Sequence, residues 1–102
     1  MKREACNMTS KTDEALNARL LVQLNAIVKL SHEHPDVASA VVEADSVMPA
    51  HKSVLLRDSW QLEDYVSFVP VLARELDPIR TNGASSARDI AKDMQEILAA
   101  GA

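Results

Sequence analysis

Turn-forming residues are scarce in this chain, which has two glycines and four prolines in 102 residues. A fold of many short β-strands needs a turn about every 8–12 residues, and Gly and Pro supply most such turns. Apolar residues instead recur every three or four positions along most of the chain, which is the period of an amphipathic helix. The sequence therefore predicts an all-α fold, a compact bundle of helices.

Four segments with this period predict the main helices, at about residues 13–31, 36–47, 59–76 and 86–99. Prolines separate the first three, because the residue before a proline avoids the helical region. A short apolar run at residues 54–56 leaves room for a fifth element near residues 50–56. Residues 1–11 are polar and aperiodic, so we expect a disordered N-terminal tail, followed by one helical domain over residues 12–102.

The charge balance is acidic, with a formal net charge of −4 and no basic cluster longer than Lys2-Arg3. Phosphate contacts supply most non-specific nucleic-acid affinity, so we expect no direct DNA or RNA binding. No segment has about 18 uninterrupted apolar residues, so no membrane span is expected. The single cysteine, Cys6, excludes an internal disulfide and favours the reducing cytoplasm.

The three aromatic residues, Trp60, Tyr65 and Phe68, all lie at the start of the third predicted helix. Aromatic side chains bury the largest areas, so the core must close around this segment. Asp58 followed by Gln61 has the spacing of a capping box. Pro70 removes a backbone hydrogen bond inside the helix, which predicts a kink or a break there.

Trp60 and Val71 lie among polar positions of this helix, within about 20° of each other on an ideal cylinder. Trp is strongly enriched at interface hot spots. We therefore expect a partner-binding surface with Trp60 and Val71 at its centre and Asp64, Ser67 and Glu75 as its polar surround. The alternative is that Trp60 covers a neighbouring loop of the same chain.

Four apolar residues align along one edge of the first helix: Leu16, Leu20, Leu24 and Ile27. Their spacing resembles a heptad repeat, but a coiled coil needs at least three or four heptads and barely two are present. Packing within the monomer is the preferred interpretation. A homodimer seam along these residues is the alternative, and the wide apolar arcs of the first and third helices predict self-association.

Residue sets typical of catalysis or cofactor binding are missing from the sequence. His32 and His34 have an H-x-H spacing and His51 follows, but zinc sites need three or four ligands. There is no G-x-S-x-G nucleophile motif and no glycine-rich phosphate loop. The sequence predicts no metal, no cofactor and no enzymatic activity.

The tripeptide Asp58-Ser59-Trp60 places a serine at the start of a predicted helix, after an aspartate and before an apolar residue. It resembles the phosphopantetheine attachment site of acyl and peptidyl carrier proteins, which are also small, acidic, four-helix domains. The resemblance covers only these residues and implies modification at Ser59. It departs from the family pattern because Trp60 replaces the usual Leu or Met and no glycine precedes Asp58.

Taken together, these features predict a non-enzymatic cytosolic module that acts by binding another protein through a helical surface. Such a module would be a small regulator, namely an inhibitor, an anti-activator or an adaptor. The alternative is a carrier-like protein modified at Ser59.

Overall fold

The computed structural model describes the backbone of residues 2–101 and the side chains of residues 14–100. Within that backbone the chain forms four α-helices, α1 (Lys2–Glu33), α2 (Pro35–Asp45), α3 (Leu62–Leu76) and α4 (Asn82–Gly101). Two 3-10 helices, η1 (Ala50–Lys52) and η2 (Val54–Ser59), lie between α2 and α3. Residues 2–101 contain no β-strand. The predicted all-α fold of four main helices is confirmed, and the short fifth element is this pair of 3-10 helices.

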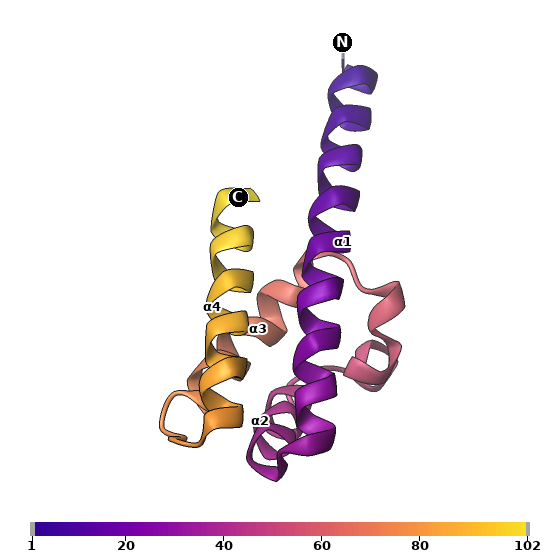
Figure 1. The fold of residues 1–102 in the computed structure, drawn as a ribbon. Helices are drawn as coiled ribbons and strands as arrows, with labels where there is room; N and C mark the ends of the chain where they lie inside the picture. The colour runs from indigo at the N-terminus through magenta and orange to yellow at the C-terminus, as the bar shows by residue number, and fades with distance from the viewer. Residues whose placement is uncertain (1, 102) are drawn as a thin grey trace.

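Helices α1 and α3 each pack mainly against α2 and α4, and smaller contacts join α1 to α3 and α2 to α4 (Figure 1). Every helix contributes to one apolar core. The largest side chains that are completely buried there are Tyr65, Phe68, Leu20, Leu24, Ile27, Leu72, Leu76 and Met94. Tyr65 and Phe68 are fully buried, so the core does close around the aromatic segment, as predicted.

The residues of the predicted dimer seam belong to this core. Leu20, Leu24 and Ile27 are 0% exposed and Leu16 is 9% exposed. The prediction that these residues form a dimer surface is therefore wrong, because α1 packs through its apolar residues against α2 and α4 of the same chain. The preferred interpretation, packing within the monomer, is confirmed.

Helix boundaries differ from the predicted ones at several ends. Helix α1 begins at Lys2 rather than near residue 13. The side chains of residues 1–13 lie outside the described part of the structure. The predicted division into a tail (residues 1–11) and a helical domain (residues 12–102) therefore stays a prediction. Helix α4 begins at Asn82 rather than at residue 86, because Thr81 is its cap: the Thr81 hydroxyl accepts a hydrogen bond from the Ala84 amide at 3.2 Å. Threonine is a favoured N-cap residue, because its hydroxyl oxygen can accept from a backbone amide in the first turn of a helix.

Helix α3 runs without interruption through Pro70, so the expected break does not occur. Pro70 and Val66, whose carbonyl loses its helical partner, are both exposed. A carbonyl freed on the solvent side can bond to water, which removes most of the cost of the missing bond.

Gly83, in the first turn of α4, is in close contact with the imidazole of His34, the residue that precedes α2. A Cβ atom added at Gly83 would lie 2.3 Å from His34 Cγ. We expect Gly83→Ala to lower the free energy of unfolding by about 1–3 kcal/mol, because overpacking outweighs the higher helix propensity of alanine. Chemical denaturation measures the change. Most of the loss should disappear when His34→Ala is combined with it, and an equal loss in both backgrounds would contradict the contact.

Candidate functional site

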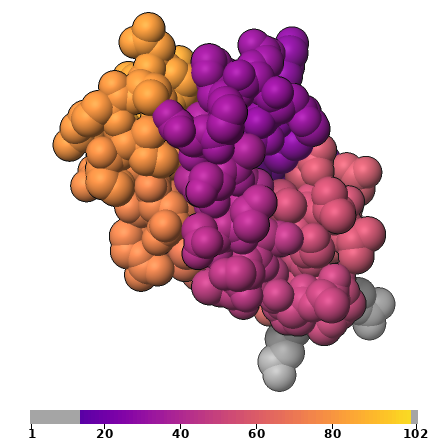
Figure 2. Space-filling view, turned by 90° about the horizontal axis from the view of Figure 1, so that it is seen from below, coloured from indigo at the N-terminus to yellow at the C-terminus, as the bar shows by residue number. Residues whose placement is uncertain are grey.

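Residues 46–61, which connect α2 to α3, include Ser59 and Trp60, two of the residues that the sequence singled out. On the face shown in Figure 2, α2 lies between the start of α4 and this connection. The connection is held at its centre by Asp45, the last residue of α2. One Asp45 carboxylate oxygen accepts from the Val54 amide at 2.7 Å and the other from the Ser53 hydroxyl at 3.0 Å. Arg57 holds the second half of the connection against α1, since Arg57 Nε donates to Asn25 Oδ1 of α1 at 2.6 Å.

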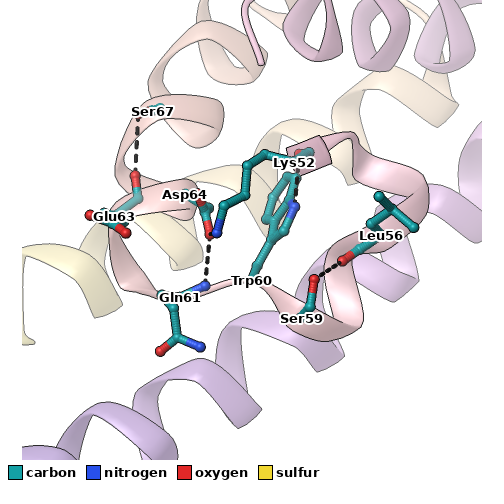
Figure 3. A network of polar contacts seen from close by, with 8 residues as sticks. All are labelled: Lys52, Leu56, Ser59, Trp60, Gln61, Glu63, Asp64 and Ser67. Carbon is teal, nitrogen blue, oxygen red and sulfur yellow. Dashed lines mark hydrogen bonds and ion pairs between the residues drawn. The ribbon is translucent and has the colours of Figure 1, made fainter. Parts of the chain in front are cut away.

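Trp60 is buried at the end of this connection, with 3% of its surface exposed. Its indole Nε1 donates to the Lys52 carbonyl at 2.9 Å (Figure 3). Its ring meets Tyr65 and Phe68 edge to face, each with centroids 5.1 Å apart. The prediction that Trp60 is an exposed partner anchor is therefore wrong, and the alternative, that it covers a neighbouring loop, is confirmed.

The physical reason is the position at which α3 begins. The N-cap is Gln61 and not Asp58, so Trp60 precedes the helix and has extended backbone angles. Trp60 and Tyr65 then occupy the two positions of a hydrophobic staple, which fixes the angle at which the chain enters a helix. Trp60 does not share the helical register that placed it beside Val71.

Asp64, expected in the polar surround, is also buried, at 6% exposure. Its carboxylate accepts from the Gln61 amide at 2.8 Å and completes a capping box with Gln61. The same oxygen lies 3.2 Å from Lys52 Nζ (Figure 3). Lys52 thus joins η1 to the start of α3 through both its carbonyl and its ammonium group, and Asp64 has a structural role here.

The other members of the predicted surface, Ser67, Val71 and Glu75, lie four residues apart along one face of α3. Val71 is half-buried and packs against the core. Ser67 is exposed, and its hydroxyl donates to the Glu63 carbonyl one turn earlier (Figure 3). Glu75 is half-buried, with Arg74 Nε 3.9 Å away. These three residues form no common surface with Trp60, because Trp60 is in the core.

Ser59 is exposed and is the last residue of η2. Its hydroxyl donates to the Leu56 carbonyl at 2.9 Å (Figure 3). The carrier resemblance required a serine at the start of a helix, whereas α3 starts at Leu62, after a buried Trp60. Nothing in this geometry favours modification at Ser59.

The sequence missed an apolar groove, of about 380 Å³, between the C-terminal half of α1, α2 and η2. Its apolar lining consists of Val28, Ala38, Val41, Val42, Val54 and Leu55, and its polar lining of Ser31, His32, Asp45 and Arg57. Leu55 is 82% exposed and Val42 is 65% exposed. An engineered cavity of about 150 Å³ can hold a benzene molecule, so this groove has room for at least two aliphatic or aromatic side chains.

Most polar groups in the groove already have partners within the chain. Both carboxylate oxygens of Asp45 accept the bonds described above. Ser31 Oγ donates to the Val28 carbonyl, and Arg57 NH1 donates to the Val54 carbonyl at 2.9 Å. The two Asp45 bonds hold the start of η2 against the end of α2, and so they fix the backbone just before Leu55.

A signal for the groove was present in the sequence, in the apolar run at residues 54–56. The run is too short for periodicity to distinguish a helical turn from an extended piece. The structure separates its members, since Val54 is 7% exposed and enters the core while Leu55 and the 49%-exposed Leu56 face outward.

Tyr65 borders a second hollow, between α1 and the start of α3, which Asn17, Arg57 and Asp58 also line. Burial, opposed by the nearby Arg57 and assisted by the charges of Asp58 and Asp64, raises the pKa of the Tyr65 hydroxyl from 10.0 to about 12. The neutral phenol is the form that the folded state favours.

We therefore expect the only tyrosine of the chain to ionise near pH 12 when folded and near pH 10 in denaturant. Because the folded-state pKa is raised, the stabilisation is complete below pH 10 and is lost as the pH rises through 10 to 12. Ultraviolet difference absorbance of the single tyrosinate measures both titrations. A folded-state midpoint near pH 10 would contradict the burial of the hydroxyl.

Among the side chains that the structure describes, no group of three His, Cys, Asp or Glu residues lies close enough together to hold a metal ion. His32, His34 and His51 are included in that statement, whereas Cys6 lies outside the described side chains. In the same part of the chain, no helix combines the length and apolar character needed to cross a membrane.

Comparisons of the chain with family models, with curated proteins and with solved structures found no match.

Proposed function

We propose that this chain is a small regulator that acts by binding another protein, as an inhibitor, an anti-activator or an adaptor, and not by catalysis. The apolar groove is the proposed binding surface. The observation that carries this proposal is the pair of large, exposed apolar residues, Leu55 and Val42, on either side of a groove whose walls are fixed by hydrogen bonds.

Two physical arguments support a protein as the ligand. Exposed apolar residues that line one depression, with polar groups at its edge, are typical of interaction sites. A binding surface that is already rigid loses little conformational entropy when it is covered, which favours affinity. Three hydrogen bonds provide that rigidity here: the Val54 amide and the Ser53 hydroxyl donate to the Asp45 carboxylate, and Arg57 Nε donates to Asn25 Oδ1.

Self-association through α1 has no place in this proposal, because Leu20, Leu24 and Ile27 are buried in the chain's own core. The cytoplasm is the proposed place of action, on the basis of the single cysteine.

Photo-crosslinking in the native cells tests the proposal. A photoreactive residue is placed at position 55, in the groove, or at position 66, which is also exposed but lies on α3 outside it. We expect a specific protein adduct from position 55 and none from position 66. No protein adduct at position 55, or the same adducts at both positions, would refute the groove as the binding surface.

A further inference from the structure

We infer that the occupant of the apolar groove is an amphipathic helical segment of the partner, with two apolar side chains on one face and a carboxylate beside them that pairs with Arg57. This inference rests on the proposed function and deepens it.

The volume and the apolar lining of the groove favour two apolar side chains of the partner as its occupants. A helix presents side chains at i and i+3 or i+4 on one face, and helix-in-groove recognition uses such anchors. The volume of about 380 Å³ has room for two of them between Leu55 and Val42. The Asp45 and Ser31 side chains are already hydrogen-bonded within the chain, so the groove favours apolar occupants.

We infer a carboxylate on the partner because Arg57 has N–H donors that are not used within the described part of the chain. A guanidinium carries five N–H donors, and Arg57 spends two of them, on Asn25 Oδ1 and on the Val54 carbonyl. Both acceptors are neutral. Among residues 14–100, no carboxylate lies within the 4.0 Å ion-pair distance of Arg57, including Asp58, which shares the second hollow with it.

Asp45 is the one carboxylate that lines the groove, and two donors of its own chain already occupy its oxygens. Among the described side chains, the groove thus offers a half-buried cation with N–H donors to spare and no unpaired carboxylate. Carboxylates bind such a guanidinium through paired, charge-assisted hydrogen bonds.

A displayed library of helical peptides, randomised on one face and selected against the full chain, tests this inference. We expect the selected peptides to share two apolar residues at i and i+3 or i+4, with Asp or Glu within one turn. Leu55→Ser should weaken binding of a selected peptide at least tenfold. Leu56→Ser is the matched control, since Leu56 is exposed on the same 3-10 helix but does not line the groove, and should change the affinity less than about twofold.

The ion pair is tested by replacing the acidic residue of the peptide by its amide. We expect a loss of about threefold or more with the natural chain, and a smaller loss with Arg57→Gln. Arg57→Gln also removes bonds that hold η2, so its fold is checked by thermal unfolding. If Arg57→Gln does not fold, the affinities of the acidic peptide and of its amide counterpart for the natural chain are measured at low and at high salt. Only the acidic peptide should lose affinity at high salt, because salt screens the ion pair.

Several results would overturn the inference. Selected peptides with basic flanks, or binding that Leu55→Ser leaves unchanged, would contradict it. A dimer mass in light scattering that Leu55→Ser abolishes would assign the groove to a second copy. Retention on phosphatidylcholine–phosphatidylglycerol vesicles that Leu55→Ser abolishes would assign it to lipid. A crosslinked protein at position 55 together with basic selected peptides would leave the proposed function standing and remove only this inference.

Discussion

Replacing Trp60 by alanine is expected to lower the free energy of unfolding by about 3–5 kcal/mol, the usual cost of truncating a buried tryptophan. Trp60 contacts both other aromatic rings and satisfies the Lys52 carbonyl, so the variant loses packing and leaves that carbonyl unpaired. The total free energy of unfolding of a domain is about 5–15 kcal/mol, so a large share of the stability should be lost. Denaturant unfolding followed by circular dichroism measures the effect.

Two further variants separate the causes. Trp60→Phe keeps a ring in the core but removes the indole donor. It should cost less than Trp60→Ala, and its own cost should include about 1 kcal/mol for the lost hydrogen bond. Val66→Ala, at a position that is 56% exposed on the same helix, should stay within about 0.5 kcal/mol of the natural chain. If Trp60→Ala and Val66→Ala had the same small effect, Trp60 would not be a core residue.

Leu24→Ala is expected to cost about 2–5 kcal/mol, because Leu24 is completely buried on the edge of α1 that the sequence offered as a dimer seam. Val22, two positions earlier and 68% exposed, is the matched control: Val22→Ala should change stability by about 0.5 kcal/mol or less. The loss for Leu24→Ala should not depend on protein concentration. A loss that grew as the protein was diluted would indicate an interface between copies.

The fold could be predicted from the sequence because the helices follow from local signals. Apolar period, scarce turn residues and Pro35 after His34 were enough to predict four helices and the break between α1 and α2. The start of α3 could not be predicted in the same way, since Asp58 is a favoured N-cap residue and Gln61 is not. The structure chooses Gln61 because Asp64 then completes the capping box and Trp60 can pack on Tyr65.

That choice of helix start explains why the predicted partner surface was wrong. Trp60 and Val71 lie on one face only if both belong to the same helix, and Trp60 precedes α3. The position of the groove could not be predicted, because it depends on how α1, α2 and η2 pack against one another, which apolar periodicity does not give. The contacts of Asp45 and Arg57 position η2 so that Leu55 faces outward and Val54 enters the core.

The proposal that this protein binds its partner through the apolar groove is tested most directly by affinity. The protein that is crosslinked at position 55 is purified, and calorimetry measures its affinity for the natural chain, for Leu55→Ser and for Leu56→Ser. Burying one leucine contributes about 1.5–3 kcal/mol, so Leu55→Ser should weaken binding at least tenfold, while Leu56→Ser changes it less than about twofold. Equal affinities for all three chains would contradict the proposal.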